Sequence, residues 1–194
     1  MSDQQRADTL RCYGNQKVKT PSLDALAQSG TLFTSCFATQ PLCSPCRASI
    51  ITGKYPARLH LTDFIAGGNY PYEKYKQPDW QKFLPLEEVT IAEVLKMAGY
   101  NTASFGKWHL SIAKKPPQSL PYNPDKQGFD EYFVTYKPSS RHDPESDAHN
   151  VKIITEKSLE FLQKNKDNPF FLYVTHNTIH TPIMGKKKLV EKYK

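Results

Sequence analysis

Apolar residues recur at helical spacing in three stretches of the chain, 20–30, 90–100 and 148–167. The second stretch carries the clearest end signal, because Thr90 and Glu93 have the spacing of a capping box. In the third, the apolar residues fall on one face, which is the pattern of an amphipathic helix. We therefore expect three helices.

Three other stretches have the composition of strands. Residues 31–38 are rich in Thr and Phe, and residues 101–110 follow the second predicted helix as a strand and its exit. Residues 169–176 form a continuous apolar run, which is typical of a strand buried on both faces. Strands that alternate with helices predict an α/β fold with a largely parallel sheet, flanked by helices. In such sheets, functional groups gather beyond the strand ends.

The remaining segments predict one short helix and two long connections. Residues 47–52 can form a helix that Gly53 ends. Residues 54–88 and 111–146 carry proline, glycine and charged residues at short intervals, so we expect loops there.

The composition is that of a globular chain. Its 194 residues are 38% apolar and 23% charged, with a net charge of +7. A positive charge would suit an anionic partner, but lysines gather in residues 185–194 and elsewhere mix with acids, so we expect a solvated face and no nucleic acid partner. No apolar run approaches the roughly 18 residues of a membrane helix. Residues 1–10 contain no hydrophobic signal core, so we expect neither a membrane contact nor a visible signal peptide.

The segment "PLCSPCRASIITG" (residues 41–53) allows three kinds of chemistry. Cys43 and Cys46 lie three apart around a proline, as in a thioredoxin-type dithiol. They could also supply half of a zinc site, which would need two further ligands at fixed spacing. The third possibility is that one cysteine is itself converted into a catalyst. Cys36, in an apolar stretch, is expected to be a buried small hydrophobe.

A longer pattern in the same segment favours the third possibility. Cys43-x-Pro45-x-Arg47, followed after four residues by Thr52-Gly53, resembles the signature of the sulfatase family. In that family a dedicated maturation enzyme oxidises the first cysteine to Cα-formylglycine.

Further segments resemble the family in the same order along the chain. They are "GYNTASFGKWHL", "GFDEYF" and "PFFLYVTHNTIHTPI". The resemblance implies an alkaline phosphatase-like α/β fold. It also implies that residues 1–194 are the N-terminal part of a sulfatase catalytic domain, truncated on its C-terminal side.

The resemblance implies a role for each matching residue. Hydrated formylglycine at Cys43 would present two hydroxyls, one to bind a divalent cation and attack sulfur and one to expel sulfate later. Arg47 would hold this diol. Lys107 would bind a sulfate oxygen, and His109 would support the formylglycine. His180 would contact sulfate and protonate the leaving alcohol, as a general acid does.

Some positions leave an alternative open. His176 is a rival to His180 four residues earlier. The family binds Ca²⁺, or Mg²⁺, through adjacent acids near its N-terminus, which Asp3 and Gln4 match only in part, with Asp8 as a possible substitute. The family also implies a periplasmic, secreted or lysosomal location.

The function implied is hydrolysis of sulfate esters, with a sulfated sugar or an aryl sulfate as substrate. The segment "GKYPARLHLTDF" looks most like family members that act on sulfated sugars, which favours a glycan sulfatase. We expect the 194-residue chain alone to be inactive, because further metal ligands of the family have no match here. Two alternatives remain. One is phosphomonoester or phosphonate hydrolysis on the same fold, and the other is a vestigial module without catalysis.

Overall fold

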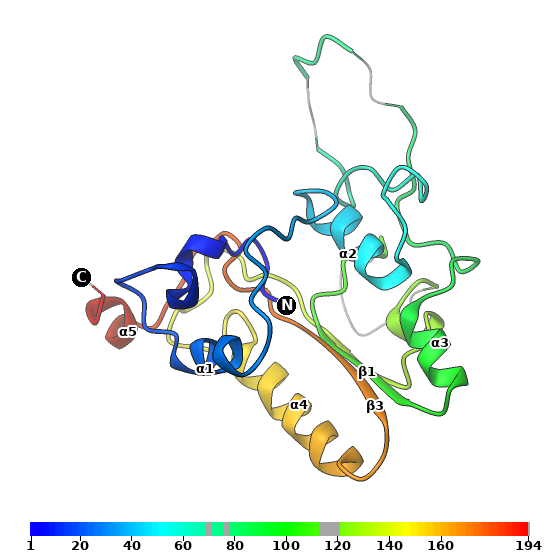
Figure 1. Ribbon diagram of the computed structural model, residues 1–194. Coiled ribbons are helices and arrows are strands. Elements are labelled where there is room, and N and C mark those ends of the chain that lie inside the picture. The colour runs from blue at the N-terminus through cyan, green and yellow to red at the C-terminus, as the bar shows by residue number, and fades with distance from the viewer. Residues whose placement is uncertain (69–70, 76–77, 113–120, 194) are drawn as a thin grey trace.

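The computed structural model describes residues 1–68, 71–75, 78–112 and 121–193, and shows a small sheet with helices on both faces (Figure 1). The strands are β1 (Asn101–Gly106), β2 (Glu131–Val134) and β3 (Phe170–Thr175). The helices are α1 (Pro21–Ser29), α2 (Cys43–Thr52), α3 (Ile91–Met97), α4 (Val151–Asn165) and α5 (Lys187–Glu191). Short 3-10 turns occupy Ala7–Thr9, Arg11–Tyr13 and Pro124–Lys126.

The sheet is parallel, in the order β2-β1-β3. The central strand β1 pairs Ser104 with Tyr132 of β2 on one side and with Tyr173 of β3 on the other. This confirms the predicted parallel α/β architecture. Because all three strands run the same way, their carboxyl ends meet at one edge of the sheet.

Strand β3 is covered on both faces, as its continuous apolar run predicts. Phe171 and Tyr173 pack toward the side of α2 and α3, while Leu172 and Val174 pack toward α4. The larger cluster is built from α2, α3 and the loops around them: Ala48, Ile51, Leu59, Leu61, Ile65, Leu84, Ala92, Trp108, Leu110 and Phe129.

Helix α3 begins with the predicted capping box. The Glu93 amide donates to Thr90 Oγ1 at 3.2 Å, and the Thr90 amide donates to the Glu93 carboxylate at 2.7 Å. Two orphan amides of the first turn are thereby satisfied. Gly99, with φ of +83°, follows the helix in the left-handed region. The helices predicted from periodicity, α1, α3 and α4, are all present.

The strand predicted over residues 31–38 is wrong. In the described part of the chain no strand pairs with this segment, which runs as an exposed connection between α1 and α2. Phe33 and Phe37 are 65% and 87% exposed, and Cys36, predicted to be buried, is exposed as well. Threonine and phenylalanine favour strands only where a neighbouring ladder and a covered face exist, and neither is found here.

One strand and one helix start also differ from the prediction. β2 lies inside the loop expected over 111–146, of which 113–120 lie outside the described residues. Its four residues are too few to show a periodic pattern, and pairing with β1 defines them. Helix α2 starts at Cys43, four residues before the predicted helix over 47–52, and ends before Gly53 as expected. None of the described helices combines the length and apolar composition needed to cross a bilayer.

Candidate active site

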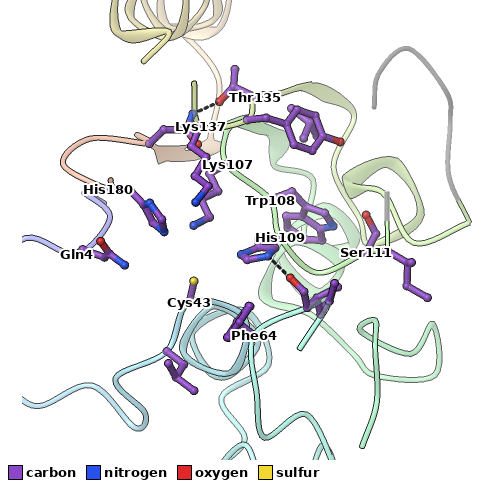
Figure 2. A pocket seen from close by; sticks show the side chains of 17 residues that line it. Gln4, Cys43, Phe64, Lys107, Trp108, His109, Ser111, Thr135, Lys137 and His180 are labelled. Atoms are coloured by element: carbon purple, nitrogen blue, oxygen red, sulfur yellow. Dashed lines mark hydrogen bonds between the residues drawn. The ribbon is translucent and has the colours of Figure 1, made fainter. Parts of the chain in front are cut away.

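A cavity of about 550 Å³ lies beyond the carboxyl ends of the strands. Figure 2 shows Cys43, Lys107, His109 and His180 around it, from α2 and from the segments that follow β1 and β3. The sequence separates these four residues widely, and the parallel sheet brings them together. The remaining lining residues are Gln4, Leu42, Phe64, Ile65, Ala66, Trp108, Ser111, Ile112, Val134, Thr135, Tyr136, Lys137 and Asn177.

Glycine is required where β1 leaves the sheet. Gly106 has φ of +116°, and a Cβ placed on it would lie 1.8 Å from the carbonyl oxygen of Thr175. The next amide, of Lys107, donates to that same oxygen at 2.8 Å. This close approach holds the segment carrying Lys107 and His109 against the end of β3.

Cys43 is the first residue of α2, so its thiol lies at the positive end of the helix dipole. It is half-buried and faces the cavity (Figure 2). Cys46 lies one turn later, and burial raises the pKa of its thiol. All four cysteines are free, so a disulfide between Cys43 and Cys46 is not present.

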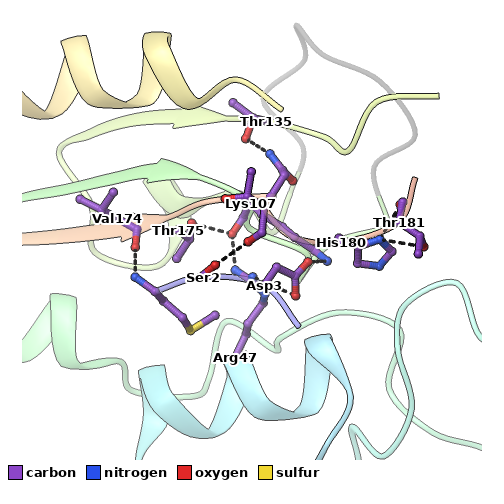
Figure 3. Close-up of polar contacts among 12 residues, drawn as sticks. Ser2, Asp3, Arg47, Lys107, Thr135, Val174, Thr175, His180 and Thr181 are labelled. Carbon is purple, nitrogen blue, oxygen red and sulfur yellow. Dashed lines mark hydrogen bonds and ion pairs between the residues drawn. The ribbon is translucent and has the colours of Figure 1, made fainter. Parts of the chain in front are cut away.

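Lys107, which lines the cavity, belongs to a buried group of charges with Asp3 and Arg47 (Figure 3). The Lys107 ammonium donates to Asp3 Oδ2 at 2.5 Å, and Arg47 Nη2 lies 3.7 Å from Asp3 Oδ1. Arg47 Nη1 also donates to the backbone carbonyl of Lys107 at 2.5 Å. Two cations therefore share one carboxylate, and the group keeps a net positive charge next to Cys43. Arg47 Nε and Nη2 have no hydrogen-bond partner among the described residues.

The first three residues reach this group because they run beside the end of β3. The Met1 amino group donates to the Val174 carbonyl at 2.7 Å, and the His176 amide donates to the Met1 carbonyl at 2.9 Å. Further along, the Asp3 amide donates to the Thr178 carbonyl at 2.7 Å. These bonds place the Asp3 carboxylate between Lys107 and Arg47.

His109 is a neutral imidazole with one unused acceptor. Its Nε2 lies 2.5 Å from the Ile65 carbonyl, and since a carbonyl only accepts, Nε2 carries the proton. Burial, together with the nearby Lys107 ammonium, lowers the pKa of His109 to about 4. Its Nδ1 is buried and has no partner within the described residues. The ring can therefore accept a hydrogen bond from a hydroxyl in the cavity.

His180 lies at the cavity and His176 does not line it. The His180 Nδ1 donates to the Thr181 carbonyl at 2.7 Å, which leaves Nε2 for a group in the cavity. His176 is half-buried, and burial and the N-terminal amino group lower its pKa. The geometry thus favours His180 over its rival for contact with a substrate.

The residues present do not by themselves complete a metal site. Asp3 supplies one carboxylate, already shared by two cations, and Gln4 supplies one amide at the cavity. Asp8 is exposed and binds Arg6 instead. Ca²⁺ takes six to eight oxygen ligands. Within the described ranges no group of three or more His, Cys, Asp or Glu side chains could hold a metal ion, and this applies to zinc as well.

Sequence reasoning missed the wall of the cavity that follows β2. Thr135, Tyr136 and Lys137 line it, and the Asn177 side-chain amide donates to Thr135 Oγ1 at 2.6 Å. The signal was present, because "GFDEYF" overlaps the first three residues of β2 and Thr135 comes directly after that strand. Had β2 been predicted, residues 135–137 would have been candidates for the site, because functional groups gather beyond the ends of parallel strands.

The whole chain is similar in sequence to known sulfatases. A family model described as Sulfatase matches residues 1–194. Steryl-sulfatase of Mus musculus is 38% identical over 69% of the chain and 20% of that protein. An ulvan-active sulfatase of Formosa agariphila is 35% identical over 94% of the chain and 35% of that protein.

A solved structure shares the fold over nearly the same span. It is a protein in complex with its substrate D-glucosamine-2-N,6-O-disulfate, with a TM-score of 0.66 and 27% identity over 93% of this chain and 34% of that one. The chain thus spans 20% to 35% of the length of these three proteins.

Proposed function

This chain belongs to the sulfatase family, and we propose that it forms part of the catalytic domain of an enzyme that hydrolyses sulfate esters, preferentially those of sugars. The observation that carries the proposal is the cavity itself, where Cys43 at the start of α2 faces Lys107, His109 and His180. We propose the same domain assignment, N-terminal part of the catalytic domain, for residues 1–194.

The charges around the cavity suit an anionic ester. The oxygens of a sulfate monoester repel an incoming nucleophile, so a site must supply positive charge in fixed positions. Lys107 and Arg47 with the single carboxylate of Asp3 leave one net positive charge beneath Cys43. We propose that Lys107 binds a sulfate oxygen, while Arg47 orients the group at position 43.

Family membership implies a formylglycine and a divalent metal in general. We propose that Cys43 is the position converted, by a maturation enzyme that is a partner of this chain. The hydrated aldehyde would supply a geminal diol, one hydroxyl to attack sulfur and a second to lose its proton and expel sulfate. His109 Nδ1, an unpartnered acceptor, would take a hydrogen bond from one of these hydroxyls.

The leaving alcohol needs a proton, and His180 is the proposed donor. Because its Nδ1–H donates to the Thr181 carbonyl, His180 would transfer a proton from Nε2 as the doubly protonated imidazolium and would be left neutral. His109 is unsuited to this task, because its pKa of about 4 keeps it neutral near pH 7.

For the cation, we propose Ca²⁺, or Mg²⁺, with Asp3 and Gln4 as two of its oxygen ligands and position 43 as a third. The incomplete ligand set supports a further proposal, that residues 1–194 alone are inactive. Measurable turnover of an aryl sulfate by the isolated chain, matured and supplied with Ca²⁺, would contradict it. We further propose a periplasmic, secreted or lysosomal location, which the family implies.

Two measurements test the proposed function. Mass spectrometry of the peptide spanning Cys43, from protein co-produced with a maturation enzyme, should show CH₂SH replaced by CHO. In the full-length protein, Cys43→Ala should lower kcat/KM on an aryl sulfate by about a thousandfold or more, because the nucleophile is lost. Cys46→Ala, which changes a thiol outside the cavity in the same helix, is the matched control and should keep most activity.

Assays of the same full-length protein distinguish sulfate ester hydrolysis from the two alternatives, phosphate ester hydrolysis and a module without catalysis. Faster hydrolysis of a phosphate monoester than of the matched sulfate ester would support the phosphatase-type reaction instead. An unmodified thiol and no turnover of either ester would support a module without catalysis.

A further inference from the structure

Lys137 is a cation of the cavity that the proposed reaction does not use. It follows β2 by three residues and, like Lys107, lines the cavity that Cys43 and His180 also line (Figure 2). It is exposed and forms no ion pair with any carboxylate in the described part of the chain. Its ammonium is therefore available to a ligand.

The two lysines differ in their partners. The Lys107 ammonium is buried and bonded to Asp3, whereas Lys137 reaches the cavity with its charge uncompensated. The described lining of this cavity contains no Asp or Glu. A second negative group on a substrate would thus meet Lys137 without competition from a protein carboxylate.

A second cavity, of about 780 Å³, adjoins the first. Both are lined by the four residues 134–137, so Lys137 lies at their boundary. The second also has polar lining from Tyr132, His142 and Asn150. Its one described carboxylate, Asp147, accepts hydrogen bonds from the amides at the start of α4, at 3.0 and 3.1 Å. Residues 134–137 are therefore the lining that the two cavities share, with Lys137 among them.

We propose that Lys137 is a specificity-determining residue that selects an acidic oligosaccharide. The sulfate to be cleaved would lie at Cys43, and a second anionic group, sulfate or carboxylate, on the same or the neighbouring sugar would bind Lys137. This rests on the proposed function and names the substrate class of that site. A sterol sulfate would find apolar lining in Leu42, Phe64 and Ile112, but it carries no second anion for Lys137.

Binding gives a test that does not depend on turnover. The full-length protein with Cys43→Ser would be titrated by calorimetry with a sulfated disaccharide and with two relatives of it. One carries a second sulfate on the neighbouring sugar, and the other carries a carboxylate there. We expect the second anion to tighten binding about tenfold or more at low salt, and less at high salt because exposed charges are screened.

Variants of Lys137 separate its charge from its bulk. In Lys137→Ala the preference for the doubly anionic sugars should fall at least fivefold, and Lys137→Arg should restore most of it. Lys166→Ala removes an exposed lysine outside both cavities and should leave the preference unchanged. The carboxylate and second-sulfate arms show which anion is preferred.

The outcomes are distinct from those of the proposed function. Equal affinity of the parent protein for the singly and doubly anionic sugars, or an undiminished preference in Lys137→Ala, would overturn the role of Lys137. Failure of the matured protein to hydrolyse any sulfate ester would overturn the proposed function, even if Lys137 still selected the second anion.

Discussion

Helices α1 and α2 are nearly equal in length, yet they are used in opposite ways. In α2, six residues are buried, including Arg47, and its first residue faces the cavity. In α1 none is buried, and the segment after it exposes Phe33 and Phe37. The site is therefore built on the packed region around α2 and the sheet, while the region of residues 7–38 lies outside the described core. Substitutions should have large effects in the first region and small ones in the second.

The largest effect is expected at Gly106. Gly106→Ala should reduce the free energy of unfolding by more than about 4 kcal/mol, because the added Cβ clashes with the Thr175 carbonyl and φ is +116°. Chemical denaturation measures this. Gly14→Ala is the matched control in the open region, where φ is +96° but nothing lies within 4 Å, so only backbone strain of about 1 kcal/mol is expected. Equal losses would show that contact with β3 does not matter.

The buried ion pair should matter more than an exposed one. Arg47→Ala leaves Asp3 with one of its two cations and opens a cavity in the core, so we expect a loss of about 3 kcal/mol. Arg6→Ala breaks the exposed pair with Asp8 and should cost less than about 1 kcal/mol. Thermal and urea unfolding compare the two. A loss of unfolding free energy in Arg47→Ala as small as that in Arg6→Ala would mean that the Asp3 pair does not stabilise the buried Arg47.

Acid should destabilise the packed region through His109. Its folded pKa of about 4 lies below the ordinary 6.5, so between these values the unfolded chain binds more protons. The contribution of neutral His109 to the free energy of unfolding is fully present above about pH 6.5. It is lost as the pH falls toward 4, and the loss for this pKa shift is up to about 3 kcal/mol. Burial of His176 acts in the same direction.

The pH effect can be assigned with one variant. In His109→Gln the slope of unfolding free energy against pH over this window should decrease, whereas His142→Gln, in an exposed turn, should retain it. An unchanged slope in His109→Gln would place the proton uptake elsewhere.

The smallest effect is expected in the open segment. Phe37→Ser removes a side chain that is 87% exposed, so stability should change by no more than about 0.5 kcal/mol. Phe129→Ser, at 1% exposure, should cost about 3 kcal/mol or more. A marked loss at Phe37 would mean that the open region is packed in solution against something.

The sequence predicted the elements whose signals are local or whose faces are covered. Thr90 and Glu93 predicted the start of α3, because a capping box needs these residue types at this spacing. The continuous apolar run predicted that both faces of β3 are buried, because burial on both faces requires apolar residues at successive positions. Residues 31–38 have the composition of a strand and lack a partner, and sequence composition cannot report a missing neighbour. β2 is the reverse case, since its four residues are a strand only because β1 lies beside them.

The candidate site shows the same division. Cys43, Lys107, His109 and His180 were selected from their motif and do lie around one cavity, although their roles remain predictions. The Asp3 carboxylate lies between Lys107 and Arg47, and its role as a metal ligand stays a prediction. Lys137 was not foreseen, because it depends on β2.

The packing of helix α2 determines when an enzyme can reach its side chains. Pro45 and Arg47, two positions of the family signature, are buried once α2 packs, with Arg47 only 1% exposed. Any enzyme that recognises those side chains must therefore reach the chain while this stretch is still unfolded. If Cys43 is the converted position, as proposed, its oxidation would compete in time with folding, and a chain that folds first would keep its thiol.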